Sequence, residues 1–392
     1  MLDENKADKL LERFYNRFNK YNSQVLEEFG KIFKQFDGLT PTEAHKLAQE
    51  LKYNATLDNL ANELSKITEK SLQDIYDMFD KVAENNLEFA KVYYEAKEVD
   101  FIPYNEREEL QRYIKALAGD TSDFLNIINT RTIGFTQYDP YTKKYVFKDL
   151  PTTYIDLIDE AVYATSTGKE NYQSAIRKTI KQLANSGIKV NEYKLGFGDY
   201  NIRLDSAVRR HILDGLRDVN QGIQDQIGSE IGSDGVELSA HNLCAEDHLP
   251  YQGKQFTNEE FEELQLNLAR PIGEYNCKHF VNRIILGVDQ PSYPKNILKE
   301  YKNNSNDKIE FEGNTYTRYE ATQVQRKIET QIRKWKDQQI IARASGNNDT
   351  ILQAQNKITQ LTTKYKEFSD AAGLDTYMQR LRVSGYRRVA IK

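Results

Sequence analysis

Cysteine is scarce in this sequence, with two in 392 residues, and two cysteines cannot build a disulfide scaffold. Proline (8) and glycine (20) are also few, which excludes a collagen-like or loop-dominated chain. No apolar run approaches the ~18 residues of a membrane span. The first residues lack the basic and apolar regions of a secretory signal. We therefore expect a protein made and kept in a reducing, aqueous compartment.

The residues that are abundant are charged and aromatic. Charged residues make up 29% and hydrophobic residues 39% of the chain, and the mean hydropathy is −0.73, a composition typical of exposed helices. The aromatic fraction of 11%, with 25 Tyr and 17 Phe, argues against disorder. The length predicts two or three domains with a sizeable core.

Apolar residues recur at three- and four-residue spacing over most of the chain, which predicts a predominantly α-helical α+β protein. Thr40 before Pro41 predicts a helix start. Further helices are expected at 56–68 and 71–96, separated by a weak capping signal. Alternating residues on either side of Asp-Pro and Gly-Asn pairs predict β-hairpins at 138–147 and 309–317.

These patterns predict three parts. Residues 1–118 form an acidic helical accessory or docking domain that binds another protein or another copy of this chain. Residues 119–316 form a central part with helices and a small mixed α/β core at 236–300 that holds the cysteines. Residues 317–392 form a basic antiparallel helical hairpin with a tail.

Positive charge is concentrated in the last part. Residues 317–392 contain 15 Lys and Arg against 7 Asp and Glu, a net charge of +8, whereas the whole chain carries −5 and the remainder therefore −13. This asymmetry favours an acidic partner, either nucleic acid or an acidic protein surface; the alternative is a solvated helix face. The candidate contact residues are Arg326, Lys327, Arg333, Lys334, Lys336, Arg380, Arg382, Arg387 and Arg388.

Common catalytic patterns are missing. The sequence contains no H-E-x-x-H zinc-protease helix, no G-x-S-x-G nucleophile elbow and no complete phosphate-binding loop. We therefore assign no catalytic residue.

One cluster of Cys and His residues has the composition of a metal-binding site. Five of the seven Cys and His residues fall within positions 241–279, spaced H-x2-C-x3-H and, further on, C-x-H. Short ligand pairs joined by a longer loop are typical of structural zinc sites. The predicted ligands are His241, His248, Cys277 and His279, with Cys244 as a spare candidate. Four protein ligands would close the site, which favours a structural zinc ion over a catalytic one.

Other interpretations of the cluster stay open. The histidines could form ordinary hydrogen bonds in a loop-rich core, with both cysteines as small buried apolar residues. Cys244 and Cys277 could pair as a disulfide, against the expectation for a reducing compartment. Catalytic use would need an open metal position beside a general base, and Glu246 and Asp247 are the acids in the first motif.

The motifs around this cluster resemble a known family. Ser239-Ala240-His241, then Asp247-His248-x3-Gln252-Gly253-Lys254, then Gly273-x2-Asn276-Cys277-Lys278-His279 resemble the signature of the phage minor capsid protein 2 family, which is similar in gene role to Mu F-like head morphogenesis proteins. Residues 174–187 and 319–336 also resemble that family. The resemblance covers roughly residues 120–392.

The resemblance implies a structural minor capsid protein, made in the bacterial host cytoplasm and located in the virion. Its implied partners are the portal protein at the portal vertex and the major capsid protein, with a role for packaged DNA or its ejection. Self-association would use the N-terminal helices. The alternative function is a zinc-dependent hydrolase or nuclease-like enzyme acting during phage entry.

Overall fold

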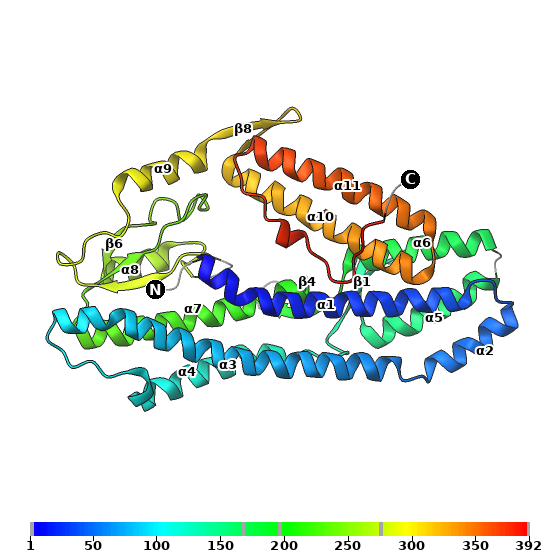
Figure 1. Cartoon of the computed structure of the whole chain (residues 1–392), viewed down its shortest axis with the longest axis horizontal. Coiled ribbons are helices and arrows are strands. Elements are labelled where there is room, and N and C mark those ends of the chain that lie inside the picture. The colour runs from blue at the N-terminus through cyan, green and yellow to red at the C-terminus, as the bar shows by residue number, and fades with distance from the viewer. Residues whose placement is uncertain (1–3, 167–168, 195–197, 274–276, 390–392) are drawn as a thin grey trace. The chain divides into compact units, whose positions relative to one another are not determined.

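The computed structural model describes residues 4–166, 169–194, 198–273 and 277–389 (Figure 1). It is a predominantly helical α+β structure, which confirms the predicted fold class. The elements are α1 (Glu4–Phe36), α2 (Pro41–Lys52), α3 (Thr56–Ala96), α4 (Glu108–Asn126), β1 (Ile133–Asp139), β2 (Lys144–Asp149), α5 (Leu150–Ser166), α6 (Lys169–Ser186), β3 (Lys189–Lys194), β4 (Gly198–Arg203), α7 (Leu204–Ile231), β5 (Gly235–Leu238), β6 (Gln255–Thr257), α8 (Asn258–Asn267), β7 (Val281–Ile284), α9 (Lys295–Asn306), β8 (Lys308–Phe311), β9 (Asn314–Thr317), α10 (Arg318–Ser345) and α11 (Asn348–Ala371), with short 3-10 helices at Tyr104–Glu106 and Met378–Leu381.

The chain divides into two compact units. The first unit comprises residues 1–13, 70–125 and 209–323, and the second unit comprises 14–69, 126–208 and 324–392. Each unit thus takes residues from all three parts that the sequence predicted. The boundaries after residues 118 and 316 remain a prediction about which segments can fold alone.

A local signal sets the start of α2. Thr40 and Glu43 form the capping box that starts α2, and Pro41 occupies its first turn, as predicted. The predicted break between 56–68 and 71–96 is wrong, because α3 runs through both segments without interruption. Thr68 does not cap a new helix; its hydroxyl donates to the carbonyl of Ser65 one turn earlier.

The core of the second unit is built on the apolar face of α1. Its fully buried aromatic side chains are Phe14, Phe18, Tyr21, Phe29, Phe33 and Phe36. Gly30 allows α1 to approach α10 closely, because a Cβ at this position would lie 2.6 Å from the Cβ of Ala344. Helices α10 and α11 run antiparallel (Figure 1), with Gln325 donating to Ser369 between them. The antiparallel sheet of this unit has the order β2-β1-β3-β4.

The first unit contains the Cys/His region. Its sheet has the order β6-β5-β7, and the antiparallel register pairs Leu238 with Val281. A small apolar core lies beneath, formed by Val236, Leu238, Ile272, Cys277 and Val281. The predicted hairpin at 309–317 is present as β8 and β9. Among the described helices, none has the length and apolar character that crossing a bilayer requires.

Candidate metal centre

Two loops bring the cysteines and histidines together. His241, Cys244 and His248 lie on the loop between β5 and β6, and Cys277 and His279 directly precede β7. The ends of these loops are adjacent because β5 and β7 pair antiparallel. Two further hydrogen bonds hold them, from Ser239 N to Phe280 O (2.9 Å) and from Phe280 N to Ser239 Oγ (2.8 Å).

Turns shape the first loop so that its side chains point inward. Leu243 adopts a positive φ of 57°, and successive backbone bonds return the chain from Ala245 to Gln252. Gln252 then accepts a hydrogen bond from His241 N at 3.0 Å and lies 3.4 Å from His279 Nε2. A buried amide therefore fixes the position of two candidate ligands at once.

The side chains form two groups that share His279. The fully buried group is His248, Cys277 and His279, and the second is His241, Cys244 and His279. Cys277 Sγ lies 3.4 Å from His248 Nδ1 and 3.3 Å from His279 Nδ1. Cys244 Sγ lies 3.5 Å from the other ring nitrogen of His279, Nε2.

These separations match the spacing of ligands around one zinc ion. Zinc bonds of about 2.3 Å to sulfur and about 2.05 Å to nitrogen, at tetrahedral angles, place neighbouring ligand atoms about 3.5 Å apart. The donor set of thiolate and imidazole also suits zinc. The buried group therefore fits a metal ion as it stands, whereas Cys244 faces the opposite ring nitrogen of His279 and reaches the same ion only if its loop shifts.

The structure places the predicted ligands together but groups them differently. His248, Cys277 and His279 are together as the sequence predicted. Cys244 is fully buried beside His279, so it joins His241 as a candidate for the fourth ligand. Both cysteines are free thiols, so the disulfide interpretation has no support in the structure. Asn276 of the last motif lies outside the described residues.

The two cysteines differ in protonation. Burial alone would raise the pKa of the Cys277 thiol, but hydrogen bonds with His248 and His279 and the charge of His279 lower it to about 5. Burial raises the pKa of Cys244 to about 12. Burial would lower the pKa of His248, yet its hydrogen bond with Cys277 raises it. Cys277 is therefore the thiolate of the pair, the form that binds metals.

Two arginines that the sequence patterns did not single out, Arg270 and Arg217, lie beside the cluster. The guanidinium of Arg270 donates hydrogen bonds to both carboxylate oxygens of Asp247, at 2.9 and 2.5 Å. The backbone carbonyl oxygen of Arg270 lies 2.7 Å from His248 Nε2. This contact orients the His248 ring so that Nδ1 faces Cys277. Arg217 of α7 is 7% exposed, donates to Gly273 O and lies near enough to Cys277 for their charges to interact. An isolated arginine in a helix gave no signal in the sequence.

The predicted basic contact residues separate into two sets. Arg326, Lys327, Arg382, Arg387 and Arg388 are exposed. By contrast, Arg333, Lys334, Lys336 and Arg380 are partly buried in the second unit.

Several of the partly buried side chains make internal contacts. Arg333 donates to the hydroxyl of Tyr15 on α1. Lys336 donates to Leu381 O at 2.6 Å and lies 4.7 Å from the ring centre of Tyr386, and burial lowers its pKa to about 8. Arg380 lies 3.9 Å from the ring centre of Tyr377. Some of the predicted basic contact residues therefore make internal contacts, and Lys336 of α10 holds the tail through Leu381 and Tyr386.

Comparison of the chain with models of known protein families finds a match to one family. The model of the family described as phage minor capsid protein 2 matches residues 2–370. Neither a curated protein nor a solved structure matches the chain. The match includes the N-terminal helices, for which the sequence motifs gave no resemblance.

Proposed function

The chain belongs to the phage minor capsid protein 2 family and is a structural component of a phage capsid, and we propose that within the virion it is located at the portal vertex. The observation that carries this proposal is the family match over residues 2–370. In this proposal the portal protein and the major capsid protein are its direct partners. The protein is made in the cytoplasm of the bacterial host.

Imaging of the virion tests this location. We expect a cryo-EM map of the phage head, refined without imposed icosahedral symmetry, to contain density for this chain next to the portal ring. The two long helices α10 and α11 give a recognisable shape for fitting. Density spread over the icosahedral shell, or on the tail alone, would contradict the proposal.

A structural zinc ion in the first unit is the second part of the proposal. The buried group of His248, Cys277 and His279 supplies three ligands, and a shift of the loop that carries His241 and Cys244 brings in the fourth, because Cys244 faces the other ring nitrogen of His279. Zinc would join the β5–β6 loop to the segment before β7. Its role is to stabilise this region.

The contacts of Asp247 favour a structural metal over a catalytic one. A hydrolytic zinc needs a bound water and a carboxylate or histidine free to accept its proton. Asp247 is the nearest acid on the ligand loop, and both of its oxygens are bound to Arg270. No family or structural match supports the alternative of a hydrolase or nuclease.

The exposed basic set is the proposed contact with packaged DNA or an acidic partner surface. Arg382, Arg387 and Arg388 lie on the tail, which is anchored to α11 by a hydrogen bond from Val389 N to Gln355. An anchored tail presents its guanidinium groups without a large entropic cost. Self-association through the N-terminal helices would use their exposed surface, which includes Tyr53 at the C-terminal end of α2, a residue that is 87% exposed.

Salt dependence separates the DNA contact from a protein contact. We expect full-length protein to bind random-sequence duplex DNA at low salt. Replacing Arg382, Arg387 and Arg388 by serine should reduce the log–log salt slope by up to about 2.7, because each phosphate contact contributes about 0.9. Serine at the exposed Lys46, Lys66 and Lys70 is the matched control and should leave the slope unchanged. No detectable binding at low salt would leave only the protein partner.

A further inference from the structure

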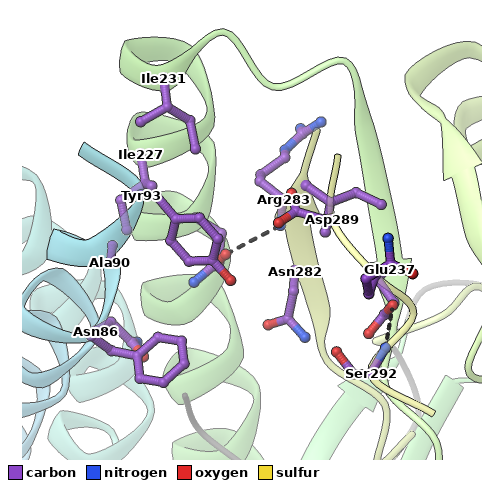
Figure 2. Close-up of a pocket in the computed structure, with 14 residues that line it drawn as sticks. Asn86, Ala90, Tyr93, Ile227, Ile231, Glu237, Asn282, Arg283, Asp289 and Ser292 are labelled. Atoms are coloured by element: carbon purple, nitrogen blue, oxygen red, sulfur yellow. Dashed lines mark hydrogen bonds between the residues drawn. The ribbon is translucent and has the colours of Figure 1, made fainter. Parts of the chain in front are cut away.

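A small cavity lies in the first unit, away from the Cys/His cluster. Its volume is about 50 Å³, and it opens between helices α3 and α7 on one side and strands β5 and β7 on the other (Figure 2). Because a single water molecule needs a cavity of roughly 10–15 Å³, this cavity has room for only a few non-hydrogen atoms. It is too small for a nucleotide or a sugar.

The two sides of the cavity differ in chemistry. The helical side presents apolar surface from Phe89, Ala90, Ile227 and Ile231. The opposite side presents polar groups that include Glu237, Asn282 and Asp289. Figure 2 shows Tyr93 reaching from the helical side towards the strands. A ligand that fits both sides has a polar head and a short apolar body.

Glu237 is the unusual group in this cavity. Its side chain is only 2% exposed. Gln255 Nε2 donates to it at 3.1 Å and Ser292 N at 3.0 Å, and both bonds reach the same oxygen, Oε2. Within the described parts of the chain, no hydrogen bond reaches Oε1 and no cation pairs with this carboxylate. Burying an unpaired charge is costly unless a ligand compensates it.

The neighbouring charges add to the negative potential. Asp289 accepts a hydrogen bond from Ile285 N through Oδ2 and has no ion-pair partner among the described residues. Arg283 also lines the cavity, but its guanidinium binds Asp225 and Asn258. The pKa of Tyr93 is raised, first by burial and then by the charges of Asp289 and Glu237.

We propose that this cavity binds a primary ammonium group carried on a short alkyl chain. The ammonium donates to Glu237 Oε1 and to Asp289, and its methylene groups lie on the apolar side formed by Phe89 and Ile227. The ring of Tyr93 adds a cation–π contact. A divalent metal ion fits less well, because it needs about six oxygen ligands and the helical side of the cavity presents the apolar side chains of Phe89, Ala90, Ile227 and Ile231. A lysine side chain of another protein and a free alkyl diamine share the proposed chemistry.

Binding of simple amines to the full-length protein tests the proposal. The probes are n-butylammonium, 1,5-diaminopentane and a lysine capped at both ends, measured by calorimetry. We expect saturable binding in the millimolar range or tighter. Tighter binding of capped lysine would identify a protein side chain as the source, and tighter binding of the diamine would identify a free amine.

Variants make the test specific. Glu237→Gln keeps an acceptor for Ser292 N but removes the charge, and we expect at least about a tenfold loss of affinity. Asp289→Asn serves in the same way if the first variant does not fold. Glu259→Gln, on the exposed face of α8, is the matched control and should bind as the parent does. No saturable binding, equal binding by Glu237→Gln, or displacement of the amine by magnesium would each overturn the proposal.

Discussion

Replacing Arg203 by alanine is expected to destabilise the second unit by about 3–5 kcal/mol. Arg203 is 13% exposed and lies 3.3 Å from both Asp205 and Asp337, whose side chains are 2% and 0% exposed. Burial alone would raise the pKa of Asp205, but the charges of Arg203 and Arg333 and the hydrogen bonds from Arg203 and Ser206 together lower it. Removing the guanidinium would leave two buried carboxylates without their ion-pair partner.

Urea unfolding of the full chain measures this loss. The transition of the second unit should move to lower urea, while that of the first unit stays in place. Arg112→Ala is the control, because Arg112 is 74% exposed and its pair with Glu109 spans 3.9 Å. We expect this control to change stability by less than about 0.5 kcal/mol.

A double variant tests the cause. Adding Asp337→Asn to Arg203→Ala removes one of the uncompensated charges while keeping an acceptor for Asn22 Nδ2, which donates to Asp337 at 3.3 Å. The double variant should therefore be more stable than the sum of the single effects predicts, by about 1–3 kcal/mol. Simple additivity would show that lost packing, and not charge, explains the first result.

Removal of zinc is the second large effect that we expect. Purified protein should contain about one zinc ion per chain by elemental analysis, and a strong chelator should lower the stability of the first unit. Binding at a free zinc concentration about 1,000 times the Kd would stabilise the fold by about 4 kcal/mol. Cys277→Ala should abolish stoichiometric zinc, because Cys277 is the thiolate of the buried group.

Two further substitutions identify the fourth ligand. Either Cys244→Ala or His241→Ala should weaken zinc binding strongly, and the other should have a smaller effect. His45→Ala changes an exposed histidine of α2 and should retain zinc. A metal-free protein whose first unit is as stable with zinc as without it would refute the structural metal and leave a hydrogen-bonded core.

Several features could be predicted from the sequence because their causes are local. A capping box and an N-terminal proline define the start of α2 within four residues. The hairpin of β8 and β9 lies where the sequence predicted it, although its turn residues are Glu312 and Gly313, one position before the predicted Gly-Asn pair. Ligand spacing placed His248, Cys277 and His279 in one site, since short pairs on adjacent loops have few other arrangements.

Other features depend on contacts between distant segments. The ion pair of Arg203 with Asp337 joins the end of β4 to α10, and no local pattern distinguishes Asp337 from other charged residues. The uninterrupted α3 also depends on packing, because Ser71 is fully buried where the sequence suggested a break. Tertiary packing overrides a weak capping signal since burial along the helix outweighs one hydrogen bond.

The sequence by itself determined the helical class, the family resemblance of residues 120–392 and the composition of the Cys/His site, because each follows from short motifs or periodicity. Tertiary structure decided which basic side chains stay exposed, placed Cys244 beside His279 with His241, and buried Glu237 opposite the apolar residues of α3 and α7. Exposure and burial arise only when segments far apart in sequence pack together, so no pattern of neighbouring residues encodes them.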